Sequence, residues 1–401
     1  MLIHIVTDRF AVGGGAEHIY QVVKGLKDFR FGIFAQPGNA GQKFAALDHV
    51  ATYTGGYHPR YVLAGQPDLV HIHHLRPLCS FFKTPFSRYK IPIIFTAHGL
   101  HIHKYEFSYP KSKSLDIFRE GDRTNDPAGA RDKTWRSSRS IPPANRWKYF
   151  LRFLLEKTVL QKPDMVIAVS REDREFLEQK YHLTNVRYLT NGIDFASVRE
   201  TAAPGKKELR KELNLPADHF IFTTVARFDF QKGYDILIKA IYLVKDLLNQ
   251  KAGKIRFLFA GNGPEFAKMN ALSRELDVSR YISFLGERAD VYKIIKAGDV
   301  FLLPSRWEGL PIVLLETGVL RIPALASSTY GNREILTGEK GILFQNEDSR
   351  DLAAKIRDII TGKYDLNRYA GDLYREIETD YNLGKMISGL NEIYRSFKKS
   401  I

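Results

Sequence analysis

The chain has 401 residues, of which 44% are hydrophobic and 26% charged, and these ordinary proportions exclude a disordered or collagen-like protein. A single cysteine, Cys79, excludes an internal disulfide framework or a thiolate zinc cluster, and no apolar run approaches the roughly 18 residues of a membrane-spanning helix. The 60 basic and 45 acidic residues leave a net charge of +15, which favours anionic partners such as phosphates, nucleic acid or an acidic membrane face.

The first half of the chain alternates short apolar runs with segments of helical periodicity. We predict strands at residues 2–7, 30–35, 69–73, 91–97 and 165–170, and helices at 16–26, 146–160 and 171–181. Apolar strands separated by helices indicate a parallel sheet that is buried on both faces. The polar segment 104–145 interrupts this rhythm and is predicted to be an insertion, either functional or a tolerated surface loop.

A second cycle of the same kind begins near residue 219. Strands are predicted at 220–226, 256–260, 281–285, 300–304 and 324–327, with helices near 233–249, 264–276, 289–297 and 309–319. The polar stretch 196–218 is interpreted as the linker. We therefore expect an α/β protein with two doubly wound, Rossmann-like domains, 1–195 and 196–384, and a C-terminal helix at 385–401 that joins the first. Ligands of such sheets bind in the crevice at the carboxyl ends of the strands.

Two glutamates, Glu308 and Glu316, follow the predicted strand at 300–304. Glu308 stands at the expected start of a helix, where unpaired amides of Leu310, Ile312 and Val313 would suit a phosphate or a sugar oxygen. Glu316 follows four apolar residues, and a buried carboxylate needs a partner. The alternative is a helix-capping Glu308 and a solvent-exposed Glu316.

Two cations, Arg227 and Lys232, follow the predicted strand at 220–226 and precede a helix. Arginine offers a planar fork to a diphosphate, and lysine offers a point charge. Because both lie at the carboxyl end of a strand, we interpret them as ligand-binding residues. The alternative is an ordinary solvated loop.

Glycine turns and a histidine occupy other strand ends. Residues 13–15 (GGG) and 260–264 (AGNGP) let the backbone approach a ligand closely, although each also suits a plain tight turn. His98 ends the strand at 91–97 and could donate to a substrate oxygen, although a lone histidine is more often structural. His71, His73 and His74 lie nearby, but no complete metal-ligand set is specified, so we expect no metal.

Together these segments resemble the retaining glycosyltransferase family 4, which has the GT-B fold. The matching segments occur in the family's order: NGID (191–194), AR through KG (226–233), AGNGP (260–264), FLG (284–286), LPS (303–305), and Glu308 with Glu316. The chain departs from the family pattern in the Thr-Gly-Val that follows Glu316 and in Tyr330-Gly331-Asn332.

The resemblance implies a nucleotide diphosphate sugar as donor substrate, with no cofactor. Arg227 and Lys232 would hold the diphosphate, Glu316 the ribose hydroxyls, and Glu308 and His98 the donor sugar. The remaining residues that the resemblance assigns to the donor are Gly14, Gly15, Asn191, Gly261, Gly263, Gly309, Leu310, Pro311 and Ile312. Transfer would proceed with retention by front-face attack, in which the leaving phosphate helps to deprotonate the acceptor.

The implied acceptor is a glycan or a lipid-linked saccharide, in polysaccharide, lipopolysaccharide or other glycoconjugate synthesis. Residues 131–162 hold nine basic and two acidic side chains among aromatic residues, and we predict that these cations contact an anionic membrane. Within this region, the apolar face of helix 146–160 is predicted to face the core; it consists of Trp147, Phe150, Leu151, Leu154 and Leu155.

We expect a cytoplasmic protein, peripheral at the inner face of the membrane, since one free thiol fits a reducing compartment. Two alternatives stay open. One is a GT-B sugar-nucleotide epimerase or a donor-binding protein without transfer activity. The other is a basic nucleic-acid-binding protein, although the sequence holds no recognised nucleic-acid motif.

Overall fold

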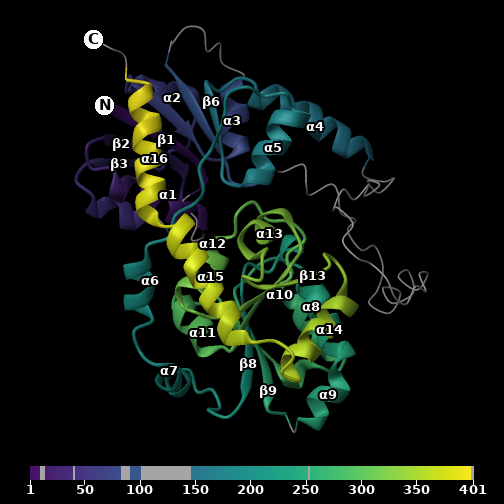
Figure 1. The fold of residues 1–401 in the computed structure, drawn as a ribbon. Coiled ribbons are helices and arrows are strands. Elements are labelled where there is room, and N and C mark those ends of the chain that lie inside the picture. The colour runs from purple at the N-terminus through teal and green to yellow at the C-terminus, as the bar shows by residue number, and fades with distance from the viewer. Residues whose placement is uncertain (10–13, 39–40, 83–90, 101–145, 252, 399–401) are drawn as a thin grey trace.

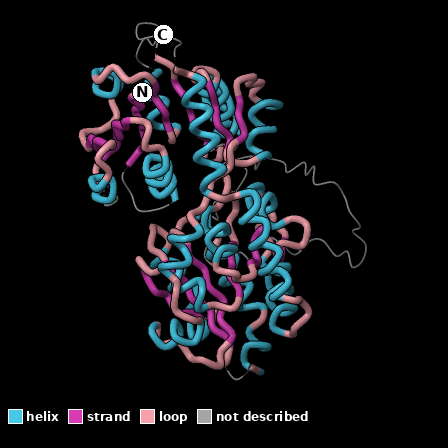
Figure 2. Tube along the Cα trace, turned by 60° about the vertical axis from the view of Figure 1, so that its left-hand side comes forward, coloured by secondary structure: helices cyan, strands magenta, loops and turns pink. Residues whose placement is uncertain are grey.

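The computed structural model describes residues 1–9, 14–38, 41–82, 91–100, 146–251 and 253–398. The predicted insertion 104–145 lies outside these residues. The described chain folds into two domains, each built on one parallel sheet with helices on both faces (Figures 1 and 2). The α/β fold class predicted from the sequence is therefore confirmed.

The first sheet has seven parallel strands in the order β3-β2-β1-β4-β5-β6-β7. Its strands are β1 (Leu2–Arg9), β2 (Arg30–Gln36), β3 (Val50–Tyr53), β4 (Leu69–Ile72), β5 (Ile93–Ala97), β6 (Met165–Ala168) and β7 (Val186–Tyr188). Its helices are α1 (Gly14–Gly25), η1 (Gly41–Ala46), α2 (Pro59–Ala64), α3 (Leu75–Phe82), α4 (Arg146–Leu160) and α5 (Arg171–Lys180). The short strands β3 and β7 were missed because they lie at the two edges and are only partly buried.

The second sheet has six parallel strands in the order β10-β9-β8-β11-β12-β13. Its strands are β8 (Phe220–Val225), β9 (Ile255–Ala260), β10 (Ile282–Gly286), β11 (Val300–Leu303), β12 (Ala324–Ser327) and β13 (Ile342–Phe344). Its helices are η6 (Phe230–Lys232), α8 (Tyr234–Leu243), α9 (Lys245–Gln250), α10 (Phe266–Glu275), η7 (Ser279–Tyr281), α11 (Val291–Ala297), α12 (Ile312–Val319), α13 (Tyr330–Leu336), α14 (Ser349–Ile360) and α15 (Leu366–Asp380).

Two segments connect the domains. The stretch interpreted as a linker contains α6 (Phe195–Thr201) and α7 (Lys206–Glu212), and Leu209 and Arg210 of α7 are buried. The chain returns through α16 (Leu383–Ser396), which lies along the first domain in Figure 1 while α15 lies on the second. Met386, Leu390 and Tyr394 of α16 belong to the hydrophobic cluster that includes β1 and α1.

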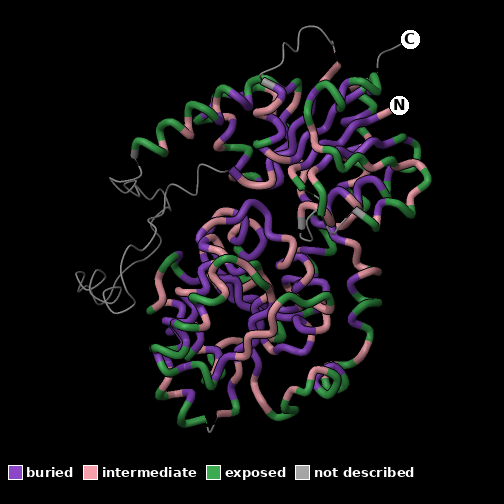
Figure 3. Tube along the Cα trace, turned by 180° about the vertical axis from the view of Figure 1, so that it is seen from behind, coloured by how far each residue is buried: buried purple, intermediate pink, exposed green. Residues whose placement is uncertain are grey.

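The sequence-based interpretation of α4 is wrong in one respect. Its apolar stripe is exposed rather than buried, as Figure 3 shows for the helix that stands out from the first domain. The helix has a second apolar face, and Val159 and Leu160 on that face pack into the core. Periodicity shows that a helix has an apolar face, but two such faces compete here, and the sequence does not say which one is buried.

Candidate active site

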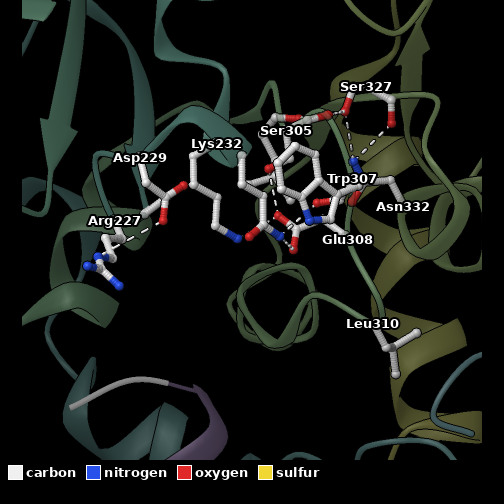
Figure 4. Close-up of polar contacts among 12 residues, drawn as sticks. Arg227, Asp229, Lys232, Ser305, Trp307, Glu308, Leu310, Ser327 and Asn332 are labelled. Carbon is white, nitrogen blue, oxygen red and sulfur yellow. Dashed lines mark hydrogen bonds and ion pairs between the residues drawn. The ribbon is translucent and has the colours of Figure 1, made fainter. Parts of the chain in front are cut away.

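Lys232 and Glu308 form the centre of a polar cluster at the carboxyl edge of the second sheet (Figure 4). Lys232 follows β8 and Glu308 follows β11, the neighbouring strand. The Lys232 Nζ atom donates to Glu308 Oε1 at 2.6 Å, and Ser305 Oγ donates to the same oxygen at 2.6 Å. Because Glu308 is only 7% exposed, these donors replace the water that its carboxylate would otherwise need. Two motifs that were separate in the sequence thus meet.

Arg306, a buried arginine that we did not single out from the sequence, holds the loops of this cluster together. Its guanidinium donates to the two carboxylate oxygens of Asp235 at 3.0 and 2.8 Å and to the Phe230 carbonyl at 2.7 Å. Its backbone N–H donates to the Gln231 carbonyl at 2.7 Å. Because Phe230 and Gln231 immediately precede Lys232, Arg306 fixes the turn that carries the lysine. In the sequence, nothing distinguishes it from a surface arginine.

Arg227 lies at the same edge, but its side chain is 69% exposed. Its Nε atom is 4.0 Å from Asp229 Oδ2, and Figure 4 shows the guanidinium apart from the Lys232–Glu308 pair. Burial raises the pKa of Asp229, and the charges of Lys232 and Arg227 oppose that rise. The Asp229 carboxylate therefore interacts electrostatically with both cations. The structure brings Arg227 near the cluster without placing it at the centre.

Gly261 and Gly263 let the loop after β9 lie directly against the loop that carries Arg227. Gly261 has a φ of +137°, and a Cβ atom there would lie 2.0 Å from the Ala226 carbonyl oxygen. A Cβ atom at Gly263 would lie 2.4 Å from the Phe228 carbonyl oxygen. Backbone packing explains both glycines, and a contact from either to a donor stays a prediction.

Gly309 brings the backbones of the two domains together. A Cβ atom on Gly309 would lie 2.5 Å from the His98 carbonyl oxygen, and one on Gly331 would lie 1.8 Å from the Gly309 carbonyl oxygen. Helix α12 begins at Ile312 after Pro311, slightly later than expected. The first-turn amides of α12 thus form a positive helix end close to the His98 loop.

Asn191 and Leu310 also join the domains. The Asn191 side-chain amide donates to the Leu310 carbonyl at 3.4 Å, and Asn191 is 3% exposed. The Leu310 side chain belongs to a hydrophobic cluster that includes Val169 and Ile193 from the first-domain side. Leu310 thus offers a donor only its backbone, and the donor-binding role of Asn191 stays a prediction.

Glu316 is paired with Tyr292 of α11, a residue that the sequence analysis missed. Burial raises the pKa of Glu316 to about 7, the hydrogen bond from Tyr292 opposes the rise, and the negative charge of Glu17 adds to it. Glu17 lies on α1, so Glu316 faces the first domain. No sequence signal pointed to Tyr292, because its position depends on how α11 packs beside α12.

His98 is partly buried and packs against the buried His18 and His73 at the carboxyl edge of the first sheet. The His98 Nε2 and His73 Nδ1 atoms are 3.0 Å apart, and the His18 ring packs edge-on against His98 with a centroid distance of 4.8 Å. Burial lowers the pKa of all three well below the usual value, so the imidazoles are neutral near pH 7. The same edge carries His74, which lies beside Gly15, the second residue of α1 after Gly14.

The three histidines also have the spacing of a metal site. One ring nitrogen of each of His18, His73 and His98 lies within 4.8 Å of the other two. Neutral imidazoles are suitable ligands for a transition metal. At the carboxyl edge of the first sheet, His98 is therefore placed to act either as a hydrogen-bond donor to a sugar or as one ligand of a three-histidine set.

Comparisons with known proteins agree with this architecture. The chain is 26% identical to the putative glycosyltransferase EpsD of Bacillus subtilis over 64% of its own length and 66% of that protein. It is 27% identical over 57% of its length to a UDP-Gal:alpha-D-GlcNAc-diphosphoundecaprenol alpha-1,3-galactosyltransferase of Escherichia coli, of which 59% is covered. The chain thus spans at most about two thirds of these two relatives.

The fold is also that of solved structures. HepE of Anabaena, solved in complex with UDP-glucose, superposes with a TM-score of 0.75 at 17% identity, covering 99% of this chain and all of that one. A model of glycosyl transferases group 1 matches residues 205–373, and a model of glycosyltransferase family 4 matches residues 12–197. With nearly the whole chain matched by these two models and folded as two facing Rossmann-like domains, the protein belongs to glycosyltransferase family 4 and has the GT-B fold.

Proposed function

We propose that the protein is a retaining, metal-independent glycosyltransferase. It moves a sugar from a nucleotide diphosphate sugar to a glycan or lipid-linked acceptor in polysaccharide, lipopolysaccharide or other glycoconjugate synthesis. The observation that carries the proposal is the hydrogen-bonded cluster of Lys232 with the buried Glu308 and Ser305, which lies at the carboxyl edge of the second sheet. Two comparisons support a uridine nucleotide donor. The galactosyltransferase of Escherichia coli is named for UDP-Gal, and HepE was solved in complex with UDP-glucose.

The chemistry follows from the charge that develops on the leaving group. When the bond between the sugar and the diphosphate breaks, negative charge grows on the phosphate oxygen. Lys232, with Arg227 at the rim, supplies fixed positive charge there, and the first turn of α12 adds amide donors. The Lys232 ammonium already has its position set by Glu308, so little reorganisation is needed during the reaction.

The other residues bind and orient the donor. Glu308 accepts hydrogen bonds from the sugar hydroxyls, and neutral His98 donates to a sugar oxygen from the first domain. Glu316 accepts from the ribose hydroxyls while Tyr292 holds its carboxylate. Retention follows from attack on the face that the diphosphate leaves, with the diphosphate taking the acceptor proton. Neither glutamate is then required as a nucleophile, in contrast to retaining glycosidases.

A nucleotide-sugar screen with and without acceptor tests the proposal. We expect nucleoside diphosphate to be released only when an acceptor is present, and NMR of the product to show the anomeric configuration of the donor. Donor conversion without an acceptor would instead indicate an epimerase. Salt-sensitive binding of nucleic acid with no donor conversion would favour a nucleic-acid-binding protein, a hypothesis for which the named relatives give no support.

Metal independence has its own test. We expect EDTA treatment to leave the rate of transfer unchanged, because Lys232 and the α12 amides supply the positive charge that Mg²⁺ provides elsewhere. Loss of activity on chelation, with recovery on adding a transition metal, would contradict this and would direct attention to His18, His73 and His98.

The proposal includes action at the cytoplasmic face of an anionic membrane, contacted through residues 131–162. Residues 131–145 lie outside the described part of the chain, and within the described part the cations are Arg146, Lys148, Arg152, Lys157 and Lys162. None of the described helices has the length and apolar content needed to cross a bilayer. A lipid-linked acceptor would be presented at such a surface.

A further inference from the structure

Helix α4 carries an exposed apolar stripe on the side that faces away from the first sheet. Its members occur at intervals of three and four residues: Trp147 (67% exposed), Phe150 (51%), Leu151 (47%), Leu154 (43%) and Leu155 (43%). They are five of the nine large hydrophobic side chains that are exposed in the described part of the chain. A contiguous exposed patch of this kind indicates an interaction surface.

The stripe is not needed to hold α4 on the domain, because the opposite face does this. Val159 and Leu160 are buried in the first-domain core, and the Phe153 ring packs edge-on against Tyr181 at 5.1 Å. The Tyr181 hydroxyl donates to buried Glu156 at 3.0 Å. One face of α4 therefore anchors the helix to the domain, and the other face carries the exposed stripe.

The charges of α4 indicate what its outer face contacts. The only acidic side chain of the helix, Glu156, is 1% exposed and accepts from Arg152 as well as from Tyr181. The charge that the helix presents outward is therefore positive, with Lys148 exposed next to Trp147 and Lys157 partly exposed one turn beyond Phe153. Lysine stems reach sideways to phosphate while tryptophan and leucine enter the acyl boundary, which is the pattern of an interfacial helix.

We propose that the outer face of α4 is a membrane-docking face, with the stripe Trp147, Phe150, Leu151, Leu154 and Leu155 inserted in the interfacial region of an anionic bilayer. The proposal rests on the proposed function in one respect, since a lipid-linked acceptor explains why docking is useful. It differs from an electrostatic contact through cations alone. Apolar insertion holds the protein at high salt, whereas screening removes a purely electrostatic attraction.

Co-sedimentation of the full chain with vesicles tests this, without donor or acceptor present. We expect binding to vesicles of phosphatidylcholine with phosphatidylglycerol, and a part of it to persist at high salt. The triple variant Trp147→Ser, Phe150→Ser, Leu154→Ser should lower the partition coefficient by about tenfold or more. A matched control, Tyr61→Ser with Leu243→Ser, removes exposed hydrophobic side chains elsewhere and should bind as the wild type does.

A second measurement uses the wild-type chain and does not depend on the folding of a variant. Brominated acyl chains should quench part of the tryptophan fluorescence, and the quenched part should fall in Trp147→Phe. A nucleoside diphosphate should still raise the melting temperature of every variant, so failure of donor binding would be seen separately from failure of docking.

Three results would overturn the proposal. The first is no vesicle binding by the wild type at low salt. The second is equal binding by the triple variant and the wild type, with all binding lost at high salt, which would show a contact through charges only. The third is a wild-type dimer that the triple variant converts to monomers while neither binds vesicles, which would show that a second copy covers the stripe.

Discussion

The Lys232 ammonium lies 2.6 Å from the Glu308 carboxylate, and this ion pair joins the loops that follow the neighbouring strands β8 and β11. The lysine is 20% exposed and the glutamate 7%, so both are largely withdrawn from water. Breaking one side of such a pair leaves a poorly solvated charge. The pair therefore does two things: it orders the site, and it keeps one cation ready for a diphosphate.

A double-mutant cycle should reveal this coupling. Lys232→Ala and Glu308→Gln should each lower kcat, and the double variant should lose less than the two losses combined. The reason is that each single variant also leaves the other partner unpaired. We expect a coupling energy of about 1–3 kcal/mol. Strict additivity in kcat would show that the two side chains act independently. Arg227→Ala should have a smaller effect than Lys232→Ala, since Arg227 lies at the exposed rim.

The pKa of Glu316, raised by burial to about 7, predicts that donor affinity depends on pH. The carboxylate must be ionised to accept from both ribose hydroxyls, so the Kd for the nucleoside diphosphate should fall as the pH rises through about 7. Tyr292→Phe removes a hydrogen bond that lowers this pKa, so it should shift the profile to higher pH. Calorimetric titrations across this range would check it. Glu316→Gln should flatten the profile, and an unchanged profile would contradict the assignment.

The same group predicts how stability depends on pH. Because the folded protein holds the Glu316 proton up to about 7 and the unfolded chain releases it near 4.5, the folded state binds more protons between these values. Glu316 contributes its full stabilisation below pH 4.5 and loses it as the pH rises to about 7. Glu316→Gln should remove this component from the melting temperature measured against pH, while Glu287→Gln, as a control, should leave it in place.

Gly331 should tolerate no side chain. A Cβ atom there would lie 1.8 Å from the Gly309 carbonyl oxygen, so Gly331→Ala must displace α13 or the Gly309 loop. Overpacking of this kind costs about 1–3 kcal/mol in the free energy of unfolding. Gly55→Ala is the control, since a Cβ atom at Gly55 has no neighbour within 4 Å among the described residues. Equal denaturation midpoints for the two variants would show that the close Gly309–Gly331 contact does not prevent a side chain at position 331.

Arg306→Ala should be among the most destabilising substitutions at this edge of the sheet. It leaves the Asp235 carboxylate, which is only 17% exposed, without its bidentate partner, and such a loss costs about 3–5 kcal/mol. Lys254→Ala, which breaks the exposed pair with Asp218, should cost no more than about 1 kcal/mol. Urea denaturation of both variants measures the difference. Similar midpoints would mean that Asp235 finds other partners.

Much of the fold could be predicted from the sequence because the central strands are continuous apolar runs. Lys232 and Glu308 were recognised separately, but their contact depends on β8 and β11 being neighbours, although β9 and β10 lie between them in the chain. Tyr292 and Arg306 were missed because only packing distinguishes them from other aromatic and basic residues. The stripe beginning at Trp147 was placed in the core because periodicity does not specify which of two apolar faces is buried.

The central claim is that Lys232 stabilises the departing diphosphate during transfer to an acceptor. Single-turnover release of nucleoside diphosphate, measured with and without acceptor for the wild type and Lys232→Ala, tests it most directly. We predict acceptor-dependent release by the wild type and a rate lower by about 10- to 150-fold in the variant, the loss expected for one charge-assisted hydrogen bond. Release at the wild-type rate by Lys232→Ala, or release that does not depend on acceptor, would contradict the account.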